Sequence, residues 1–310
     1  MAKKILVTGG AGFIGSHVVG ALLKAGACVT VVDNLSTGAR SNLPKHKCLK
    51  LIIKDVLACS TKDLKGPFDG AAHLAGTPSV QMSWRAPVKA HEDNLTTTVH
   101  VINLCRELKI KRLVLASSAA VYGNTAVLPI REETNTQPLS PYGLQKLAGE
   151  QYGKLFASSK GLAVIALRLF NVFGPRQNPG SPYSGVISIF CERMRKGQPI
   201  LVYGSGRQTR DYVYVEDVAN AFMKALNAPI KGNAFAAVNI ASGRGISLNE
   251  LIGVLRSCCP SWKTDIQYLP ARAGDIRHST ASVTKAKRLL GFKCRHDVRS
   301  GLKKLVNDCG

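Results

Sequence analysis

The stretch ILVTGGAGFIGS, residues 5–16, decides the fold of this 310-residue chain. Its first four residues, 5–8, are apolar or β-branched and predict a short buried strand. From Phe13 to Leu23 apolar residues recur at helical spacing. The glycines between strand and helix predict a tight turn, and they fit both G-x-G-x-x-G (Gly10, Gly12, Gly15) and G-x-x-G-x-x-G (Gly9, Gly12, Gly15). Strand, glycine turn and helix together predict a dinucleotide site.

Glycine suits such a site because a Cβ atom would hold the backbone away from the pyrophosphate, which the helix N-terminus attracts. The next apolar run, 28–32, ends in Asp33, about twenty residues on, where a carboxylate binds the adenosine ribose hydroxyls. Asp33 favours NAD. NADP needs a cation for its 2′-phosphate; Asn34 and Leu35 offer none, and Arg40 is the only nearby candidate.

The rest of the chain continues the alternation of strands and helices. Strands are predicted at 49–53, 68–74, 112–116 and 162–170, with helices at 87–108 and 140–159, a loop at 77–87 and another at 128–139. This pattern predicts an α/β fold with a doubly wound (Rossmann) parallel sheet as the NAD-binding domain, residues 1–170. After irregular residues 171–175, helices at 186–196, 215–227 and 247–258 predict a smaller α/β substrate-binding lobe, residues 171–310, with some elements returning to the first domain.

Composition excludes several classes of protein. No apolar run approaches the length of a membrane span, and the first strand begins too early to leave room for a signal peptide, so we expect a cytoplasmic enzyme with no membrane insertion. Nine cysteines without a C-x-x-C pair predict reduced thiols and no metal site. The formal net charge of +23 is spread along the chain without aromatic interleaving, so we expect no nucleic-acid partner.

Three residues form a candidate catalytic group. Tyr142 and Lys146 stand at i and i+4 of one predicted helix, so they share a face. A nearby ammonium favours the phenolate, and we expect it to lower the pKa of Tyr142 and make a general base. Ser118, at the end of a predicted strand, faces the same cleft and can hydrogen-bond the reacting hydroxyl.

With these residues in place, the chain resembles the NAD-dependent nucleotide-sugar epimerase/dehydratase family of extended short-chain dehydrogenases/reductases. The motifs run nearly end to end: GGAGFIGS from Gly9, DNLSTG from Asp33, HLAG from His73, SSAAVYG from Ser117, SPYGLQK from Ser140, RLFNVFGPRQNP from Arg168, RQTRDYVYVEDVANA from Arg207 and RAGDIRHS from Arg272.

The resemblance implies roles for further residues. The implied cofactor contacts are Gly9, Gly12, Phe13, Ile14, Gly15, Asp33, Asn34, Asp55, Val56, His73, Leu74, Ala75, Gly76, Asn94, Ser117, Tyr142, Lys146 and Phe170. The implied contacts to the UDP-sugar substrate are Ser79, Val80, Ser118, Asn171, Val186, Arg210, Arg272, Asp275 and Ser279. Two arginines facing a diphosphate make sense as planar, multidentate clamps.

The resemblance also narrows the reaction. Sugar 4,6-dehydratases of this family carry an Asp-Glu pair, and UDP-glucuronate decarboxylases a Glu, where this chain has Ala119 and Ala120. Elimination of a hydroxyl is slow without a positioned acid to protonate it. The expected activity is therefore 4-epimerisation of a UDP-hexose through a 4-keto sugar, with tightly held NAD.

The sugar itself is indicated by position 279, which flanks the C2 substituent in related epimerases. A large aromatic residue there resembles enzymes limited to unacetylated hexoses. Ser279 leaves room for an N-acetyl group, which favours UDP-N-acetylglucosamine and its galacto epimer, with UDP-glucose/UDP-galactose next. Pro78 departs from the lysine that some glucose epimerases use to contact the cofactor.

Other functions remain open at this point. Among enzymes they are a UDP-uronate 4-epimerase or a nucleotide-sugar 4-ketoreductase, and the latter would need fresh cofactor each turn. A non-catalytic NAD-binding regulator is a third hypothesis, although such proteins usually lose the tyrosine or lysine. The resemblance further implies a homodimer whose four-helix interface uses the helices at 87–108 and 140–159, and a place in carbohydrate metabolism, including polysaccharide biosynthesis.

Overall fold

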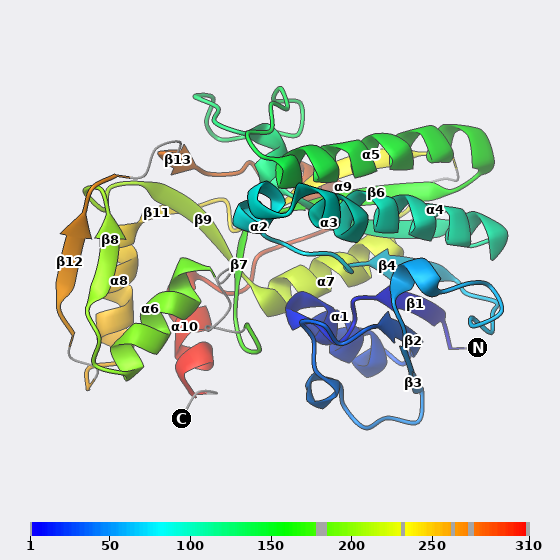
Figure 1. Cartoon of the computed structure of the whole chain (residues 1–310), viewed down its shortest axis with the longest axis horizontal. Helices are drawn as coiled ribbons and strands as arrows, with labels where there is room; N and C mark the ends of the chain where they lie inside the picture. Colours follow the sequence, from blue (N-terminus) through cyan, green and yellow to red (C-terminus); the bar gives the residue numbers. More distant parts are fainter. Residues whose placement is uncertain (1, 178–184, 231–232, 262–263, 272–275, 308–310) are drawn as a thin grey trace.

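A seven-stranded parallel sheet forms the centre of the computed structural model (Figure 1), which describes residues 2–177, 185–230, 233–261, 264–271 and 276–307. Its strands, in spatial order, are β10 (Phe235–Ile240), β6 (Ala163–Leu169), β5 (Arg112–Ser118), β4 (Gly70–His73), β1 (Lys4–Thr8), β2 (Cys28–Asp33) and β3 (Leu49–Ile53). The predicted doubly wound parallel sheet is confirmed. Because β1 and β4 are parallel neighbours, the segments that follow them meet at the carboxyl ends of these strands.

Helices cover both faces of this sheet because successive strand residues point to opposite sides. Ile5 and Val7 belong to a core shared with α1 (Phe13–Lys24), α7 (Val215–Leu226) and α9 (Thr284–Leu290). Leu6 belongs to the opposite core, which packs against α4 (Thr97–Glu107) and α5 (Pro141–Lys160). Ser140 caps helix α5 by accepting a hydrogen bond from Gly143 N, and Pro141 occupies the first turn of the helix.

A second lobe is built from short elements around its own core of Phe173, Ile187, Phe190 and their neighbours. It contains β7 (Asn171–Phe173), α6 (Val186–Arg195), β8 (Ile200–Tyr203), β9 (Thr209–Tyr214), β11 (Gly245–Ser247), α8 (Leu248–Cys258), β12 (Ile266–Leu269), β13 (His278–Ser279) and α10 (Val298–Asn307). Strand β9 is central, since β7, β11 and β13 all pair with it. The predicted helices α6, α7 and α8 lie within one residue of their expected bounds.

Two local predictions were wrong, and one predicted helix is less regular than expected. The expected loop at 77–87 contains helix α2 (Val80–Arg85), which Ser79 caps by accepting a hydrogen bond from Met82 N. The expected helix at 87–108 is confirmed as one continuous helical run, made of α3 (Pro87–His91), a π-helical segment (Glu92–Thr96) and α4. Residues 171–173, expected to be irregular, form β7, because β9 supplies the pairing that a short local pattern cannot predict.

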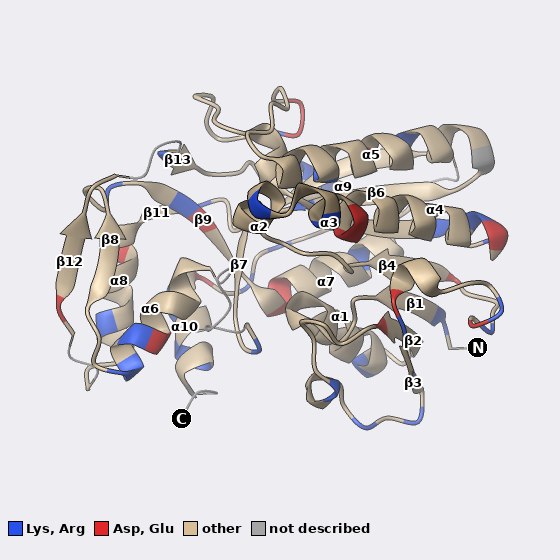
Figure 2. Cartoon of the chain, viewed as in Figure 1, with Lys and Arg blue, Asp and Glu red and all other residues tan. Residues whose placement is uncertain are grey.

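The charge of the molecule is distributed rather than gathered. Figure 2 shows Lys and Arg positions on elements of both lobes, with acidic positions scattered among them. None of the helices in the described part of the chain combines the length and hydropathy that crossing a bilayer requires.

Candidate active site

The glycine turn between β1 and α1 is tightly packed against its surroundings. Gly9 has a φ of +71°, and a Cβ atom there would lie 2.5 Å from the backbone nitrogen of Ala75. A Cβ atom at Gly15 would lie 2.0 Å from the carbonyl oxygen of Gly9. These two glycines are therefore required by the fold itself, which needs close approach of backbone to backbone.

Gly12 is different, because its surroundings leave space. A Cβ atom there would meet only the Gly9 carbonyl oxygen within 4 Å, at 3.4 Å. Gly12 is the N-cap of α1, no side chain caps this end, and the first turn, which begins with Phe13 and Ile14, contains no acidic residue. An open cradle at a helix N-terminus with free N–H groups fits the pyrophosphate of a dinucleotide.

We expect Gly15→Ala to lower the free energy of unfolding by about 1–3 kcal/mol, since the added methyl group must displace backbone. The variant should also lose bound dinucleotide on purification. The matched control is Gly20→Ala on the same helix, where a Cβ atom meets nothing within 4 Å. That change should stabilise α1 by about 0.5–1 kcal/mol. Denaturant unfolding of both variants measures the difference, and equal stabilities would contradict the packing argument.

Asp33, at the end of β2, holds the turn in place. Its side chain is 7% exposed, and its two oxygens accept hydrogen bonds from Ala11 N and Leu35 N, each at 2.8 Å. A carboxylate has further lone pairs, so these bonds leave acceptors for the two hydroxyls of a ribose. Next to it, Asn34 Nδ2 donates to Asp55 Oδ2 at 3.0 Å, and buried Val56 follows Asp55. The predicted adenosine contacts therefore lie on neighbouring strand ends.

His73, the last residue of β4, is a buried and neutral connector. Thr98 Oγ1 donates its only hydrogen to the carbonyl oxygen of Asn94 at 2.6 Å, so it must accept from His73 Nε2 at 3.1 Å. His73 Nδ1 then accepts from Thr8 Oγ1 at 2.7 Å. Burial lowers the pKa of His73 to about 3, helped by the charge of Lys146. With both ring nitrogens engaged, His73 connects β1 and β4 to α4.

We expect His73 to destabilise the folded chain in acid. Its folded pKa of about 3 lies below the ordinary 6.5, so below pH 6.5 only the unfolded chain takes up a proton. Protonation of the unfolded chain therefore lowers the free energy of unfolding by about 2 kcal/mol at pH 5, relative to pH 7.5. His73→Gln keeps an acceptor and a donor but does not titrate. The wild type should therefore lose more stability than this variant between pH 7.5 and 5, and parallel losses would contradict the assignment.

The segment after β4 lies beside the glycine turn. Leu74, Ala75 and Gly76 are half-buried. Gly76 has a φ of +145°, and a Cβ atom there would lie 2.7 Å from Asn94 Oδ1. Asn94, in the π-helical segment, is 1% exposed and holds this loop by accepting from Thr77 N at 3.1 Å and donating to Thr77 O at 3.2 Å. Asn94 thus fixes the shape of the segment that follows β4, and π-helical turns often mark functional sites.

The catalytic candidates Ser118, Tyr142 and Lys146 lie together where β5 meets α5. The Ser118 hydroxyl is near enough to the phenol of Tyr142 to lower its pKa, and Lys146 Nζ is 5.8 Å from the centroid of the Tyr142 ring. Their electrostatics differ from our expectation. Burial raises the pKa of Tyr142, and the contact that lowers it is with Ser118. Burial also lowers the pKa of Lys146 to about 8, since desolvation disfavours its charge.

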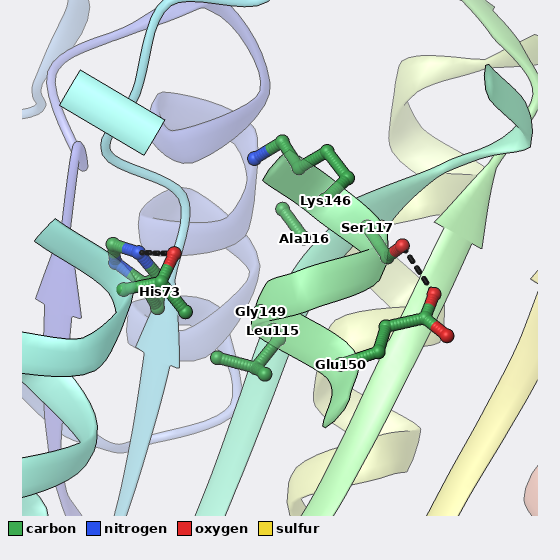
Figure 3. A pocket seen from close by; sticks show the side chains of 8 residues that line it. His73, Leu115, Ala116, Ser117, Lys146, Gly149 and Glu150 are labelled. Atoms are coloured by element: carbon green, nitrogen blue, oxygen red, sulfur yellow. Dashed lines mark hydrogen bonds between the residues drawn. The ribbon is translucent and has the colours of Figure 1, made fainter. Parts of the chain in front are cut away.

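Ser117 lies one residue earlier and faces a small cavity beneath this group (Figure 3). Its hydroxyl donates to Glu150 Oε1 at 2.5 Å, and Figure 3 shows this bond on the side of the cavity away from His73. Glu150 also pairs with Arg168, whose Nη2 lies 2.7 Å from Oε2; the side chains are 2% and 7% exposed. Arg168 Nη1 donates to Tyr122 Oη at 2.9 Å. The hydroxyl of Ser117 thus joins β5 to α5 through its bond with Glu150.

Some of the predicted substrate residues meet on the small sheet of the second lobe. Ser279 on β13 pairs with Arg210 on β9, and Asn171 on β7 pairs with Tyr212, two residues further along β9. Asn171 Nδ2 donates to Asp211 O at 3.0 Å, and Arg210 Nη1 donates to Thr209 O at 2.9 Å. These pairings bring Asn171, Arg210 and Ser279 close together along β9.

The other predicted site residues have different positions. Phe170 is 2% exposed and packs with Tyr122, their ring centroids 6.4 Å apart. Ser79 is 2% exposed and caps α2, whereas Val80 is 39% exposed. Val186 begins α6. Arg272 and Asp275 lie outside the described residues.

Two buried carboxylates were missed by the sequence analysis. Glu150 stands four residues after Lys146 on α5, so its spacing placed it on the catalytic face. Asp211 is 0% exposed and accepts hydrogen bonds from Ser242 N and Oγ, Gly243 N and Ala281 N. It fastens the segment after β13 to β9, and the sequence signal was an acidic residue directly before the apolar residues 212–215.

Comparisons with known proteins agree with this geometry. The model of the NAD dependent epimerase/dehydratase family matches residues 5–241. A UDP-glucose 4-epimerase of Lacticaseibacillus casei is 35% identical, over 94% of this chain and 92% of the relative. A UDP-N-acetylglucosamine 4-epimerase structure from Methanobrevibacter ruminantium, in complex with UDP-N-acetylmuramic acid, is 35% identical with a TM-score of 0.92, covering 99% of both chains. The UDP-glucose 4-epimerase structure of Thermotoga maritima, with UDP-glucose, is 36% identical with a TM-score of 0.92, covering 98% and 97%.

Proposed function

Because the chain belongs to the NAD-dependent epimerase/dehydratase family and is an enzyme of the nucleotide-sugar 4-epimerase type, we propose that it interconverts the 4-epimers of a UDP-hexose through a 4-keto sugar. One observation carries the proposal: Ser118, Tyr142 and Lys146 meet where β5 ends and α5 begins, while positions 119 and 120 hold only methyl groups. Without an acid at these positions, proton transfer at one hydroxyl is favoured over elimination of another.

The chain's residues divide the work of this reaction. NAD, when bound across the Gly12 cradle and Asp33, supplies a hydride acceptor and donor. Tyr142 removes the proton of the C4 hydroxyl and later returns one. Ser118 hydrogen-bonds the same oxygen and holds it against the phenol. Lys146, with its Nζ 5.8 Å from the centroid of the Tyr142 ring, is placed to stabilise the phenolate once the proton has left.

We propose UDP-N-acetylglucosamine and its galacto epimer as the preferred substrate pair, with UDP-glucose and UDP-galactose as possible further substrates. The support is Ser279, which is 9% exposed and opposite Arg210 in the sheet, so a small side chain stands beside a candidate diphosphate ligand. A small residue leaves volume for an N-acetyl group, which a tyrosine would fill.

The test incubates protein purified without added cofactor with UDP-N-acetylglucosamine and, separately, UDP-glucose, and resolves the 4-epimers. We expect conversion of the acetylated sugar. Ser279→Tyr should lower the ratio of kcat/KM for UDP-N-acetylglucosamine to kcat/KM for UDP-glucose at least tenfold. His278→Tyr, a change at the exposed neighbouring residue, should leave this ratio unchanged. Conversion of UDP-glucose alone would overturn the sugar assignment. A need for stoichiometric reduced cofactor would overturn epimerisation in favour of a 4-ketoreductase.

A homodimer is part of the same proposal. Leu144 and Leu155 of α5 are 58% and 67% exposed, and they are about three helical turns apart, which places them on one side. Val88 of α3, which packs beside α5, is 73% exposed. These apolar side chains support an interface of two helices from each copy. Sedimentation velocity of the purified chain measures the state, and a monomer would exclude the interface.

A further inference from the structure

Two half-buried cysteines lie side by side far along the sheet from the catalytic group. Strands β2 and β3 run parallel, with Val29 opposite Leu49 in register, and Val29 N donates to Cys48 O at 2.7 Å. Cys28 and Cys48 are the residues immediately before this pair, so they are opposite one another and point to the same face. Neighbouring strands are about 4.8 Å apart, which lies within the Cα separation that a disulfide spans.

The neighbouring thiol also affects the ionisation of Cys28. A hydrogen bond with Cys48 is the largest of the effects that raise the pKa of Cys28, and burial is the next. Cys28 therefore keeps its proton in the presence of its neighbour. Both thiols are free and only half-buried, whereas Cys59, Cys105, Cys191 and Cys259 are buried. Small oxidants can therefore reach the pair more readily than they reach these four cysteines.

The position of the pair separates it from the proposed reaction. Both cysteines stand at the amino ends of their strands, and Asp33 stands at the opposite, carboxyl end of β2. Strand β3 is the edge of the sheet and pairs only with β2 among the described strands (Figure 1). A covalent bond here would fasten the edge strand without entering the nucleotide cleft.

We propose that Cys28 and Cys48 form a dithiol that hydrogen peroxide converts to a disulfide joining β2 to β3. The Cys48 thiolate attacks peroxide; an S–O bond forms, the O–O bond breaks, and hydroxide leaves as water after taking a proton. The Cys28 sulfur then attacks the sulfenic sulfur; an S–S bond forms, the S–O bond breaks, and a second water leaves with the Cys28 proton. Two thiols are oxidised by two electrons, and one peroxide is reduced to two waters.

The test treats the folded full-length chain with hydrogen peroxide, blocks remaining thiols by alkylation and maps tryptic peptides. Trypsin releases Cys28 in peptide 25–40 and Cys48 in tripeptide 48–50. We expect these two peptides joined, with a mass two hydrogens below their sum, and the joined species lost in Cys48→Ser. Cys258→Ser, a control at another half-buried thiol, should keep it. Separate alkylation of both cysteines, or either one joined to another cysteine, would overturn the proposal.

A second measurement does not depend on oxidation. Phenylarsine oxide bridges two thiols that are close together and binds a single thiol weakly. We expect the chain and its Cys258→Ser variant to bind one equivalent, and Cys28→Ser and Cys48→Ser each to bind none. Equal binding by all four proteins would show that the bridged thiols lie elsewhere and would overturn the pair.

Discussion

Tyr142→Phe is expected to lower kcat for 4-epimerisation by about 10²- to 10⁴-fold, the range that a positioned acid–base group contributes. Tyr142 is 9% exposed, and phenylalanine keeps its ring and packing while removing only the hydroxyl that exchanges the proton. Bound NAD and the free energy of unfolding should change little. The matched control is Tyr152→Phe on the same helix, at a side chain that is 41% exposed. Epimer formation under saturating substrate measures both.

The pH profile separates a catalytic tyrosine from a structural one. Burial raises the pKa of Tyr142 and the bond with Ser118 lowers it, so Ser118→Ala should raise this pKa further. Because the base form exists above the pKa, the rising limb of kcat against pH should move to higher pH in Ser118→Ala. Ser158→Ala, at an exposed position of α5, should leave the limb unmoved. A Tyr142→Phe variant with more than a tenth of wild-type kcat would contradict the role assigned to the hydroxyl.

The sequence predicted the parts of the site that depend on local geometry. The glycine turn follows from a strand, a helix and their spacing, and Tyr142 and Lys146 share a face because helical residues four apart always do. The electrostatics could not be predicted in this way. From the sequence we expected Lys146 to lower the pKa of Tyr142, but burial, a property of the whole fold, raises this pKa, and Ser118 is the contact that lowers it.

Structural elements that depend on partners far away in the chain also could not be predicted from the sequence. Strand β7 has three residues and exists because it pairs with β9, about forty residues later. The π-helical segment that positions Asn94 interrupts a pattern that looks like one regular helix. Asp211 has four donors from residues 242, 243 and 281, so its role depends on three chain segments meeting. Such features need the tertiary structure, because no local spacing encodes them.

Arg168→Met is expected to lower the free energy of unfolding by about 3–5 kcal/mol, the cost of leaving one partner of a buried ion pair alone. Glu150 is 2% exposed and Arg168 7%, so water cannot replace the lost guanidinium. The matched control is Arg195→Met, where Arg195 is 51% exposed and pairs with Glu192 on α6. Exposed pairs contribute about 0–1 kcal/mol, so the control should change little. Denaturant unfolding measures both variants.

Arg168→Met should also affect the catalytic residues, because Glu150 forms a hydrogen bond with Ser117 and Ser117 directly precedes Ser118. In Arg168→Met the Glu150 carboxylate is buried without a positive partner, so we expect it to turn towards water. Its hydrogen bond with Ser117, which joins β5 to α5, is then weakened. We expect kcat of the protein that remains folded to fall while KM for the UDP-sugar changes little. Glu150→Met combined with Arg168→Met removes both charges and should recover part of the stability, but not the bond to Ser117 or the kcat. Recovery of kcat in the double variant would show that the lone charge, rather than the lost tie between β5 and α5, disturbs the site.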